Sequence, residues 1–215
     1  MTTKGDDSAP GTSGRFRWLR AASDRVPTRW FAAIGTGLFL VATAAFGGLS
    51  PAASPAIARL EPGEQHHNDQ LALTVERAVL VDEYPDAGVY VEEGQRVAAI
   101  VLTVENTWTE PLPAYADSSV TESFTVEELA GTPADSVARA DDATVSPWLQ
   151  PGVPVRIVVA WAVDAGRFAD GDALHLTLND MTLHTGSFVA NGQWWTDPVA
   201  AATVTVPLDD EGPGT

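Results

Sequence analysis

Three aspartates in one loop are the first residues whose type and spacing could do chemistry. The segment "DAGRFADGD" holds Asp164, Asp170 and Asp172, and hard carboxylate oxygens of this kind suit Ca²⁺. The spacing differs from that of an EF-hand loop, and Gly-Asp turns are common between strands. We therefore expect a turn here, and we keep calcium binding as the alternative.

Tryptophans near turns form the second set of candidates, and the chemistry they offer is binding. Trp108 follows "VENT", and Trp194 and Trp195 lie between "NGQ" and "TDP". Exposed aromatic rings beside hydrogen-bonding side chains stack on sugars or anchor protein interfaces. The alternative is that these rings cap the ends of the fold. Adjacent strand residues face opposite sides, so we expect one of Trp194 and Trp195 to be buried and the other exposed.

The sequence lacks the residues that most catalytic mechanisms require. The chain has no cysteine, which excludes a thiol nucleophile, a disulfide framework and a Cys-ligated metal. The one lysine is Lys4, and the sequence shows no phosphate loop, His-Glu-x-x-His helix or Gly-x-Ser-x-Gly elbow. We predict no catalytic residue, no metal ligand and no cofactor, and therefore a protein that is not an enzyme.

Charge is distributed unevenly along the chain. The formal net charge is −17; residues 1–29 hold six bases and three acids, and from Arg59 onward six arginines face 26 Asp and Glu. The second part therefore has a formal charge of −20. It repels phosphate backbones, so we expect no nucleic-acid partner.

An uncharged stretch of 20 residues, Trp30 to Leu49, predicts a membrane-spanning helix. At about 1.5 Å per residue it would extend ~30 Å, the thickness of a bilayer core. Apolar residues lie on every side of this helix, whereas a surface helix would show a polar stripe. Gly47 and Gly48 end the apolar run, and Pro51 prevents its continuation. A buried core helix is the alternative.

Basic residues set the expected topology. Five arginines lie in residues 15–29, and only Arg59 lies close behind the apolar run. Short basic flanks stay in the cytoplasm, so we predict a single-pass protein of the cell membrane with an extracellular C-terminal domain. The sequence Ala56-Ile57-Ala58 also fits a cleavage pattern, so secretion after cleavage near Ala58 is the alternative.

The remaining chain alternates apolar and polar residues in a pattern typical of strands. Such runs are 71–80, 96–106, 122–129, 153–163, 173–178 and 200–208. The run 153–163 places Val153, Trp161 and Val163 on one apolar face. Runs of this kind, separated by turn signals, predict an all-β fold of two antiparallel sheets packed face to face.

A resemblance accompanies this pattern. "VLTVENTWTEPLP", "FTVEEL", "WLQPGVPVRIVVAWAV" and "LHLTLND" resemble the small immunoglobulin-like domains on exported and membrane-anchored proteins of Gram-positive bacteria. The Arg-rich composition looks actinobacterial. In that family a strand ends in a Val-x-Asn turn, and a Leu-x-Pro-Gly turn introduces the strand with the strongest apolar face. The family is largely uncharacterised, so the resemblance implies an immunoglobulin-like β-sandwich and an extracytoplasmic location, and no activity.

We thus expect five segments along the chain. They are a partly disordered basic cytoplasmic tail (1–29), a transmembrane signal anchor (30–49), a linker (50–69), an immunoglobulin-like β-sandwich (70–207) and a disordered tail (208–215). The expected function is that of a membrane-anchored extracytoplasmic binding or accessory protein whose partner is another envelope or membrane protein. The alternative is a carbohydrate-binding module for the cell wall or an exported polysaccharide.

Overall fold

The computed structural model describes residues 28–45, 56–115, 119–187 and 191–212. The chain divides into two units, Met1–Ser54 and Pro55–Thr215. Several expectations lie outside the described residues: the cytoplasmic tail up to residue 27, the end of the apolar run at Gly47 and Gly48, and the last residues of the C-terminal tail.

The first unit contains one described helix, α2, which comprises Thr28–Ala45 and coincides with most of the apolar stretch. Its large apolar side chains are exposed: Trp30, Ile34, Leu38, Phe39, Leu40 and Val41. A helix is therefore present where the sequence predicts one. In the part of the chain that the structure describes, no helix meets both the length and the apolarity needed to cross a membrane.

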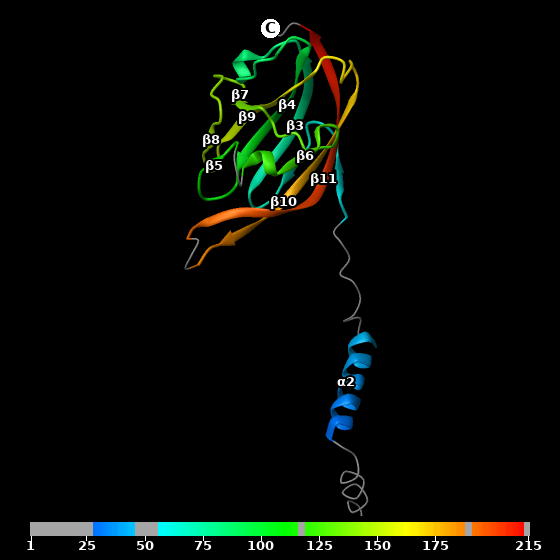
Figure 1. Ribbon diagram of the computed structural model, residues 1–215. Helices are drawn as coiled ribbons and strands as arrows, with labels where there is room; N and C mark the ends of the chain where they lie inside the picture. Colours follow the sequence, from blue (N-terminus) through cyan, green and yellow to red (C-terminus); the bar gives the residue numbers. More distant parts are fainter. Residues whose placement is uncertain (1–27, 46–55, 116–118, 188–190, 213–215) are drawn as a thin grey trace, which may run out of the picture. The chain divides into compact units, whose positions relative to one another are not determined.

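The second unit is built of strands (Figure 1). They are β1 (Ala58–Leu60), β2 (Gln65–His67), β3 (Leu71–Val81), β4 (Gln95–Asn106), β5 (Leu112–Pro113), β6 (Phe124–Val126), β7 (Ser136–Arg139), β8 (Trp148–Leu149), β9 (Pro154–Asp164), β10 (Ala173–Thr185) and β11 (Gln193–Gly212). Short 3₁₀ turns connect some of them: η1 (Pro85–Ala87), η2 (Val120–Glu122) and η3 (Glu127–Leu129).

A continuous hydrogen-bonded path, β6-β10-β11-β3-β4-β9-β7, folds over to form two layers. The long strand β11 joins them, because its first part pairs with β10 and its last residues, Leu208–Gly212, pair with β3. β1 pairs with β11, and β2 pairs with β3. The all-β sandwich expected from the sequence is therefore present.

The main core lies between the two layers, and it follows the predicted alternation. Ile100 and Leu102 of β4 pack in one cluster with Leu174 and Leu176 of β10. Trp161 of β9 is 4% exposed in the same cluster, and its indole N–H donates to the carbonyl of Thr132 at 3.2 Å. The assigned parity of these strands is confirmed.

A second apolar cluster lies on the opposite face of β3, β4 and β9. It contains Val79, Ala99 and Val158, and the segment 82–94 covers it with Ala87 and Val89. Gly88 ends η1 with φ +76°, and a Cβ there would lie 3.0 Å from a methyl carbon of Val145. Both faces of these strands are therefore buried, which the sequence analysis did not anticipate.

Several features differ from the expected fold. Leu208–Gly212 pair with β3, so the sandwich includes residues that were expected to belong to the disordered tail 208–215. The run 122–129 is a strand only at Phe124–Val126 and continues as the 3₁₀ turn η3.

Strands β1 and β2 lie inside the segment expected to be a linker, so the sandwich starts before residue 70. The pairs β1–β11 and β11–β3 are parallel, where only antiparallel pairs were expected. Val153 is 49% exposed, because the turn at Gly152 (φ +69°) delays the start of β9 to Pro154.

Asn106 ends β4 and joins three segments. Its side-chain amide donates to the carbonyls of Glu110 (2.8 Å) and Leu149 (3.0 Å), and its side-chain oxygen accepts from the N–H of Trp108 (2.9 Å). The side chain is fully buried. Asn106 therefore has a structural role: it fixes the end of the strand and the backbone that carries Trp108.

Candidate binding site on the β10–β11 arm

β10 and β11 continue past the sandwich body as a two-stranded extension, which we call the arm: residues 179–185 and 193–200. Figure 1 shows it in orange, leaving the layered body. Register shifts at Leu178/Asn179 and at Asp180/Thr182 mark its start. Bulges of this kind bend a strand pair, so the arm departs from the plane of its own sheet.

The inner face of the arm is held against the body by Trp195. Its side chain is 3% exposed and belongs to the main core. The Trp108 ring meets the Trp195 ring edge-on, with centroids 5.8 Å apart and an interplanar angle of 85°. Leu183, directly across from Trp195, also packs on the core. Aromatic pairs in this geometry stabilise beyond their buried area, so this face is fixed.

The outer face presents Trp194, which is 37% exposed. His184 lies directly across the strand, and its ring is nearly parallel to the indole (18°), with centroids 6.3 Å apart. The Nε2 atom of His184 lies 2.8 Å from Oδ2 of Asp197. An exposed aromatic ring is thus flanked by an imidazole that a carboxylate holds in place.

The backbone of Asp197 has an unusual conformation. Its φ is +54°, a value that few residues other than glycine adopt, and Pro198 follows it. Aspartate tolerates this region better than most residues. Ala143 and Ser146 have φ values of the same kind elsewhere in the chain, so this conformation describes the course of the backbone at Asp197 and does not by itself mark a site.

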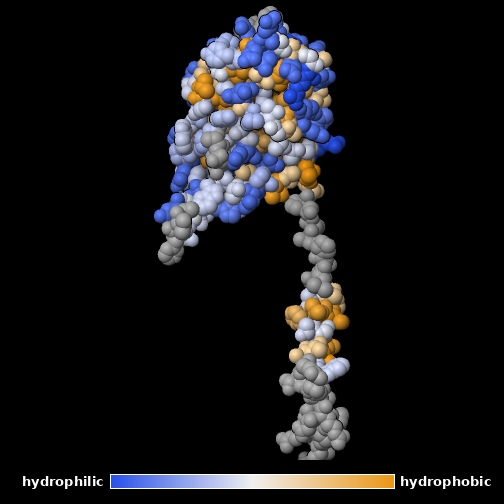
Figure 2. All heavy atoms as spheres, in the orientation of Figure 1, coloured by the Kyte–Doolittle hydropathy of each residue, from blue (hydrophilic) through white to orange (hydrophobic). Residues whose placement is uncertain are grey.

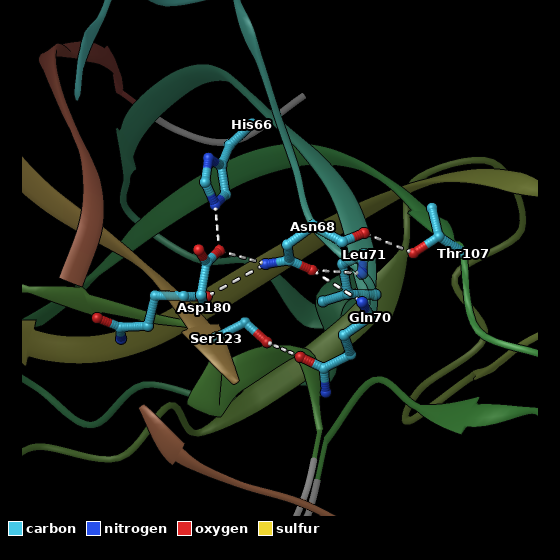
Figure 3. Close-up of polar contacts among 8 residues, drawn as sticks. His66, Asn68, Gln70, Leu71, Thr107, Ser123 and Asp180 are labelled. Carbon is cyan, nitrogen blue, oxygen red and sulfur yellow. Dashed lines mark hydrogen bonds and ion pairs between the residues drawn. The ribbon is translucent and has the colours of Figure 1, made fainter. Parts of the chain in front are cut away.

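A polar network fixes the base of the arm (Figure 3). Asn68 donates to Oδ1 of Asp180 at 2.9 Å, and Nε2 of His66 lies 2.9 Å from the same oxygen. The side-chain oxygen of Asn68 accepts from the N–H groups of Gln70 (2.9 Å) and Leu71 (2.8 Å). The start of β3 is thereby tied to the first residues of the arm, which limits its movement at the base.

The three tryptophans that the sequence suggested as binding residues differ in their exposure in the structure. Trp194 is exposed as a binding residue requires, and the expected split in burial within the pair is confirmed. Trp195 is buried and Trp108 half-buried, so both support the arm from beneath and neither presents an open ring. The binding role of Trp194 stays a prediction.

Two of the three aspartates, Asp170 and Asp172, cap backbone groups with their side chains. Oδ2 of Asp172 accepts from the N–H of Ala169 (2.8 Å), and Oδ1 of Asp170 accepts from the N–H of Asp210 (3.0 Å). Among the described residues, no group of three or more His, Asp and Glu side chains is placed to hold a metal ion.

His184, Asp197 and Trp148 were not among the residues predicted from the sequence. His184 meets Trp194 through strand register. Asp197 follows closely after Trp194 in the chain and joins the site through its contact with His184. Trp148, on β8, is 62% exposed, so exposure alone does not distinguish Trp194. The distinguishing feature is its ordered polar surrounding.

No protein-family model matches the chain, and no curated protein matches it. Among solved structures, the chain is similar to an uncharacterised β-sandwich protein from Clostridium difficile 630 (12% identity, TM-score 0.36), with 73% of this chain and 97% of that one covered. It is also similar to a candidate lipoprotein from Staphylococcus aureus (9% identity, TM-score 0.36, the same coverages).

A further similarity is to a candidate lipoprotein from Bacillus subtilis, at 16% identity and a TM-score of 0.31, with 67% of this chain and 38% of that one covered. At these scores the similarities carry no argument about function.

Proposed function

We propose that the chain is an exported, membrane-anchored accessory protein whose immunoglobulin-like β-sandwich binds another envelope protein. The contact surface is the outer face of the arm, centred on Trp194. The observation behind the proposal is the ordered set of Trp194, His184 and Asp197: an exposed aromatic ring, a nearly parallel imidazole and a carboxylate that holds it. The proposed role is binding rather than catalysis.

The arm is suited to this role by its rigidity. Trp195 fixes it from beneath, and Asn68 and His66 fix its base. A surface that is already ordered loses little conformational entropy on binding. Tryptophan is among the residues that contribute most to interfaces, and about 2 kcal/mol or more can depend on one such side chain.

Charge indicates the kind of partner. The face of the strand unit that Figure 2 shows is largely hydrophilic, and the chain from Arg59 onward has 26 acids against six arginines. Complementary charge speeds association and suppresses wrong partners. The partner surface proposed here is therefore basic around an apolar pocket that accepts Trp194.

The membrane part of the proposal depends on the sequence and on α2. Residues 30–49 are uncharged behind a basic flank, and α2 exposes large apolar side chains. A bilayer is the surrounding that such side chains favour. A tag placed after Thr215 should be cleaved when protease is added to intact protoplasts, and protection of that tag would reverse the topology.

Co-purification tests the partner. The full chain, extracted in mild detergent, should retain a stoichiometric envelope protein, and Trp194→Ala should weaken this complex about tenfold or more. Trp148→Ala is the matched control, because it removes another exposed indole from the same domain. Equal loss from both variants, or from neither, contradicts the proposed surface.

A second candidate is binding to cell-wall glycan or exported polysaccharide. It is favoured by the hydroxyl and imidazole groups around Trp194, since Thr182 and Thr196 pair across the arm on the same side as His184 and Trp194. Sugar rings stack on exposed indoles and hydrogen-bond to such neighbours. Retention on insoluble glycan that persists at high salt, and is lost in Trp194→Ala, would favour this candidate, because a charge-assisted protein complex weakens with salt.

A further inference from the structure

The arm has a free backbone edge along β10. In the body, β10 pairs with β6 up to Leu178, and the N–H of Asn179 donates to the carbonyl of Ser123 at 2.8 Å. Beyond Asn179, β11 is the one strand among the described residues that pairs with β10. The edge of residues 181–185 that faces away from β11 is therefore open to another strand.

Strand register shows which backbone groups lie on this edge. The N–H of Gly186 donates to the carbonyl of Gly192 at 2.9 Å, and the pairing of residues 182–185 with β11 continues from there without a shift. Hydrogen-bonded and non-hydrogen-bonded pairs alternate along an antiparallel ladder. Leu183 and Thr185 therefore direct their N–H and C=O groups away from β11, toward the open edge.

The opposite edge of the arm is protected against pairing. On β11, Asp197 has a φ of +54° and Pro198 has no N–H to donate. Proline and local distortions on an edge strand keep other strands from pairing with it. Residues 181–185 contain no proline, lysine, Asp or Glu, and none of them has a positive φ. An added strand would therefore pair with β10 rather than with β11.

The arm also restricts the side chains of an added strand. Its two carboxylates, Asp180 and Asp197, have side chains that are 50% and 67% exposed, and the arm contains no lysine or arginine. Basic residues complement this charge, and acidic residues are repelled by it. Met181 and Leu183 pack partly buried on the main core, so apolar residues suit their side of the strand. Successive strand residues face opposite sides, so apolar and basic residues must alternate.

We propose that the β10 edge of the arm binds an extended segment of the partner envelope protein, in which apolar residues alternate with lysine or arginine. The segment joins the sheet as a strand beside residues 181–185, and its backbone pairs with the N–H and C=O groups of Leu183 and Thr185. This inference rests on the proposed function of the arm. It adds the mode of recognition, which is main-chain pairing next to the outer face that carries Trp194.

Synthetic peptides of eleven residues test this occupant. Valine alternates with lysine in the first peptide and with glutamate in the control. The full chain in bilayer discs, with empty discs as the blank, should bind the lysine peptide at least about tenfold more tightly. Saturation with this peptide should slow amide exchange of Leu183 and Thr185 about tenfold or more, because each N–H gains a carbonyl partner. The inference is overturned if the lysine peptide does not bind at millimolar concentration, or if it binds without protecting these two amides.

Proline substitutions locate the edge. Thr185→Pro removes an N–H from the β10 edge, and the proline ring blocks an incoming strand. Gln193→Pro is the matched control, because Gln193 lies directly across from Thr185 and its N–H points to the edge of β11. Both variants lose the same hydrogen bond, from Nε2 of Gln193 to Oγ1 of Thr185 (3.2 Å).

The two proline variants should differ in affinity. Thr185→Pro should weaken binding of the lysine peptide about tenfold or more, and Gln193→Pro should leave it unchanged. Equal affinities of the two variants overturn the inference. The circular dichroism spectrum checks that each variant is folded, and amide protection in the unmodified chain gives the same decision without a variant.

Co-purification of the envelope protein separates this inference from the proposed function. Loss of that protein from both Trp194→Ala and Thr185→Pro, with retention by Gln193→Pro, supports both. Loss from Trp194→Ala with retention by Thr185→Pro overturns the strand addition and leaves the outer face as the contact surface. Self-association of the full chain in detergent that Thr185→Pro removes would make a second copy the occupant and would also overturn the inference.

Discussion

The sandwich body and the arm share the strands β10 and β11, yet the two regions differ in how many faces of their strands are buried. In the body, β4 alternates between two cores: Ile100 and Leu102 face the main cluster, and Ala99 and Val101 face the second. In the arm, Trp195 faces the core, whereas its neighbour Trp194 faces outward.

Burial on one face or on both faces determines which side chains of a strand remain accessible. A strand that is covered on both faces exposes no side chain that could contact a partner. The arm is covered on one side, so its inner residues hold it in place and its outer residues are available for binding. If stability and binding are divided in this way, substitutions in the body, on the inner face of the arm and on its outer face should have different effects.

The body should depend strongly on Trp161. Trp161→Ala removes a buried indole and leaves a cavity in the main core, so we expect a loss of about 3–5 kcal/mol in the free energy of unfolding. Chemical denaturation of the full chain, followed by circular dichroism, measures it. A loss below about 1 kcal/mol would mean that the main core does not depend on β9 as described.

The arm should respond unequally to its two tryptophans. Trp195→Ala should cost about 3 kcal/mol and speed hydrogen exchange of the arm amides, because the contact with Trp108 is lost. Trp194→Ala should change stability by no more than about 0.5 kcal/mol, as for other exposed residues. Thermal melts and amide exchange of both variants decide the matter. Equal destabilisation would show that the outer face is also structural.

Asn106 should link the body to the arm. Asn106→Ala leaves the carbonyls of Glu110 and Leu149 and the N–H of Trp108 without their partner. We expect a loss of about 2 kcal/mol, the cost of unsatisfied buried polar groups, and faster exchange in the arm above Trp108. The comparison is Thr107→Ala, which removes a single hydrogen bond to the carbonyl of Asn68 (3.0 Å). A smaller effect for Asn106→Ala than for Thr107→Ala would contradict the bridging role.

The smallest effect should come from a titrating pair that ties η3 to β10. Oε1 of Glu128 lies 2.5 Å from the ring atom Nδ1 of His175. Oε2 of Glu128 accepts a hydrogen bond from the backbone N–H of His175 at 2.9 Å. The side-chain hydrogen bond with Glu128 raises the pKa of His175 above 6.5. Burial pushes the pKa of Glu128 upward, but the hydrogen bonds from His175 outweigh it and lower that pKa below 4.5.

The pH dependence follows from these directions. His175 contributes fully to the free energy of unfolding below the pKa that it has in the unfolded chain. This contribution is lost as the pH rises through its raised pKa in the folded protein. The contribution of Glu128 is complete above its unfolded pKa and is lost as the pH falls through its lowered folded pKa. Glu128→Gln should therefore lower the melting temperature most between about pH 4.5 and 6.5.

A pH series of melting curves measures that difference. Glu93→Gln, an exposed residue of the segment 82–94, is the matched control and should show no maximum in this window. A difference between Glu128→Gln and the unmodified chain that stays constant from pH 3 to pH 9 would rule out the pair as a titrating contact.

Alternation in the sequence located β3, β4 and β9, because a strand with a buried face must repeat apolar residues every second position. It found only parts of the two longest strands, 173–178 of β10 (Ala173–Thr185) and 200–208 of β11 (Gln193–Gly212). The inward direction of Trp161 also follows from the alternation. Short strands were missed: β1, β2 and β7 have three or four residues, too few to show a period. Their pairing comes from neighbours distant in the sequence, such as Thr203 beside Arg59.

The alternation of side chains along a strand also predicted part of the candidate site. Adjacent residues on a strand point to opposite faces, so the sequence by itself determined that Trp194 and Trp195 differ in burial. Only the tertiary structure decided which of them is exposed, because that depends on where Trp108 and the core lie. It also decided that His184 and Asp197 accompany Trp194, since cross-strand register and the bulge in β11 are set by packing and hydrogen bonds that no local pattern encodes.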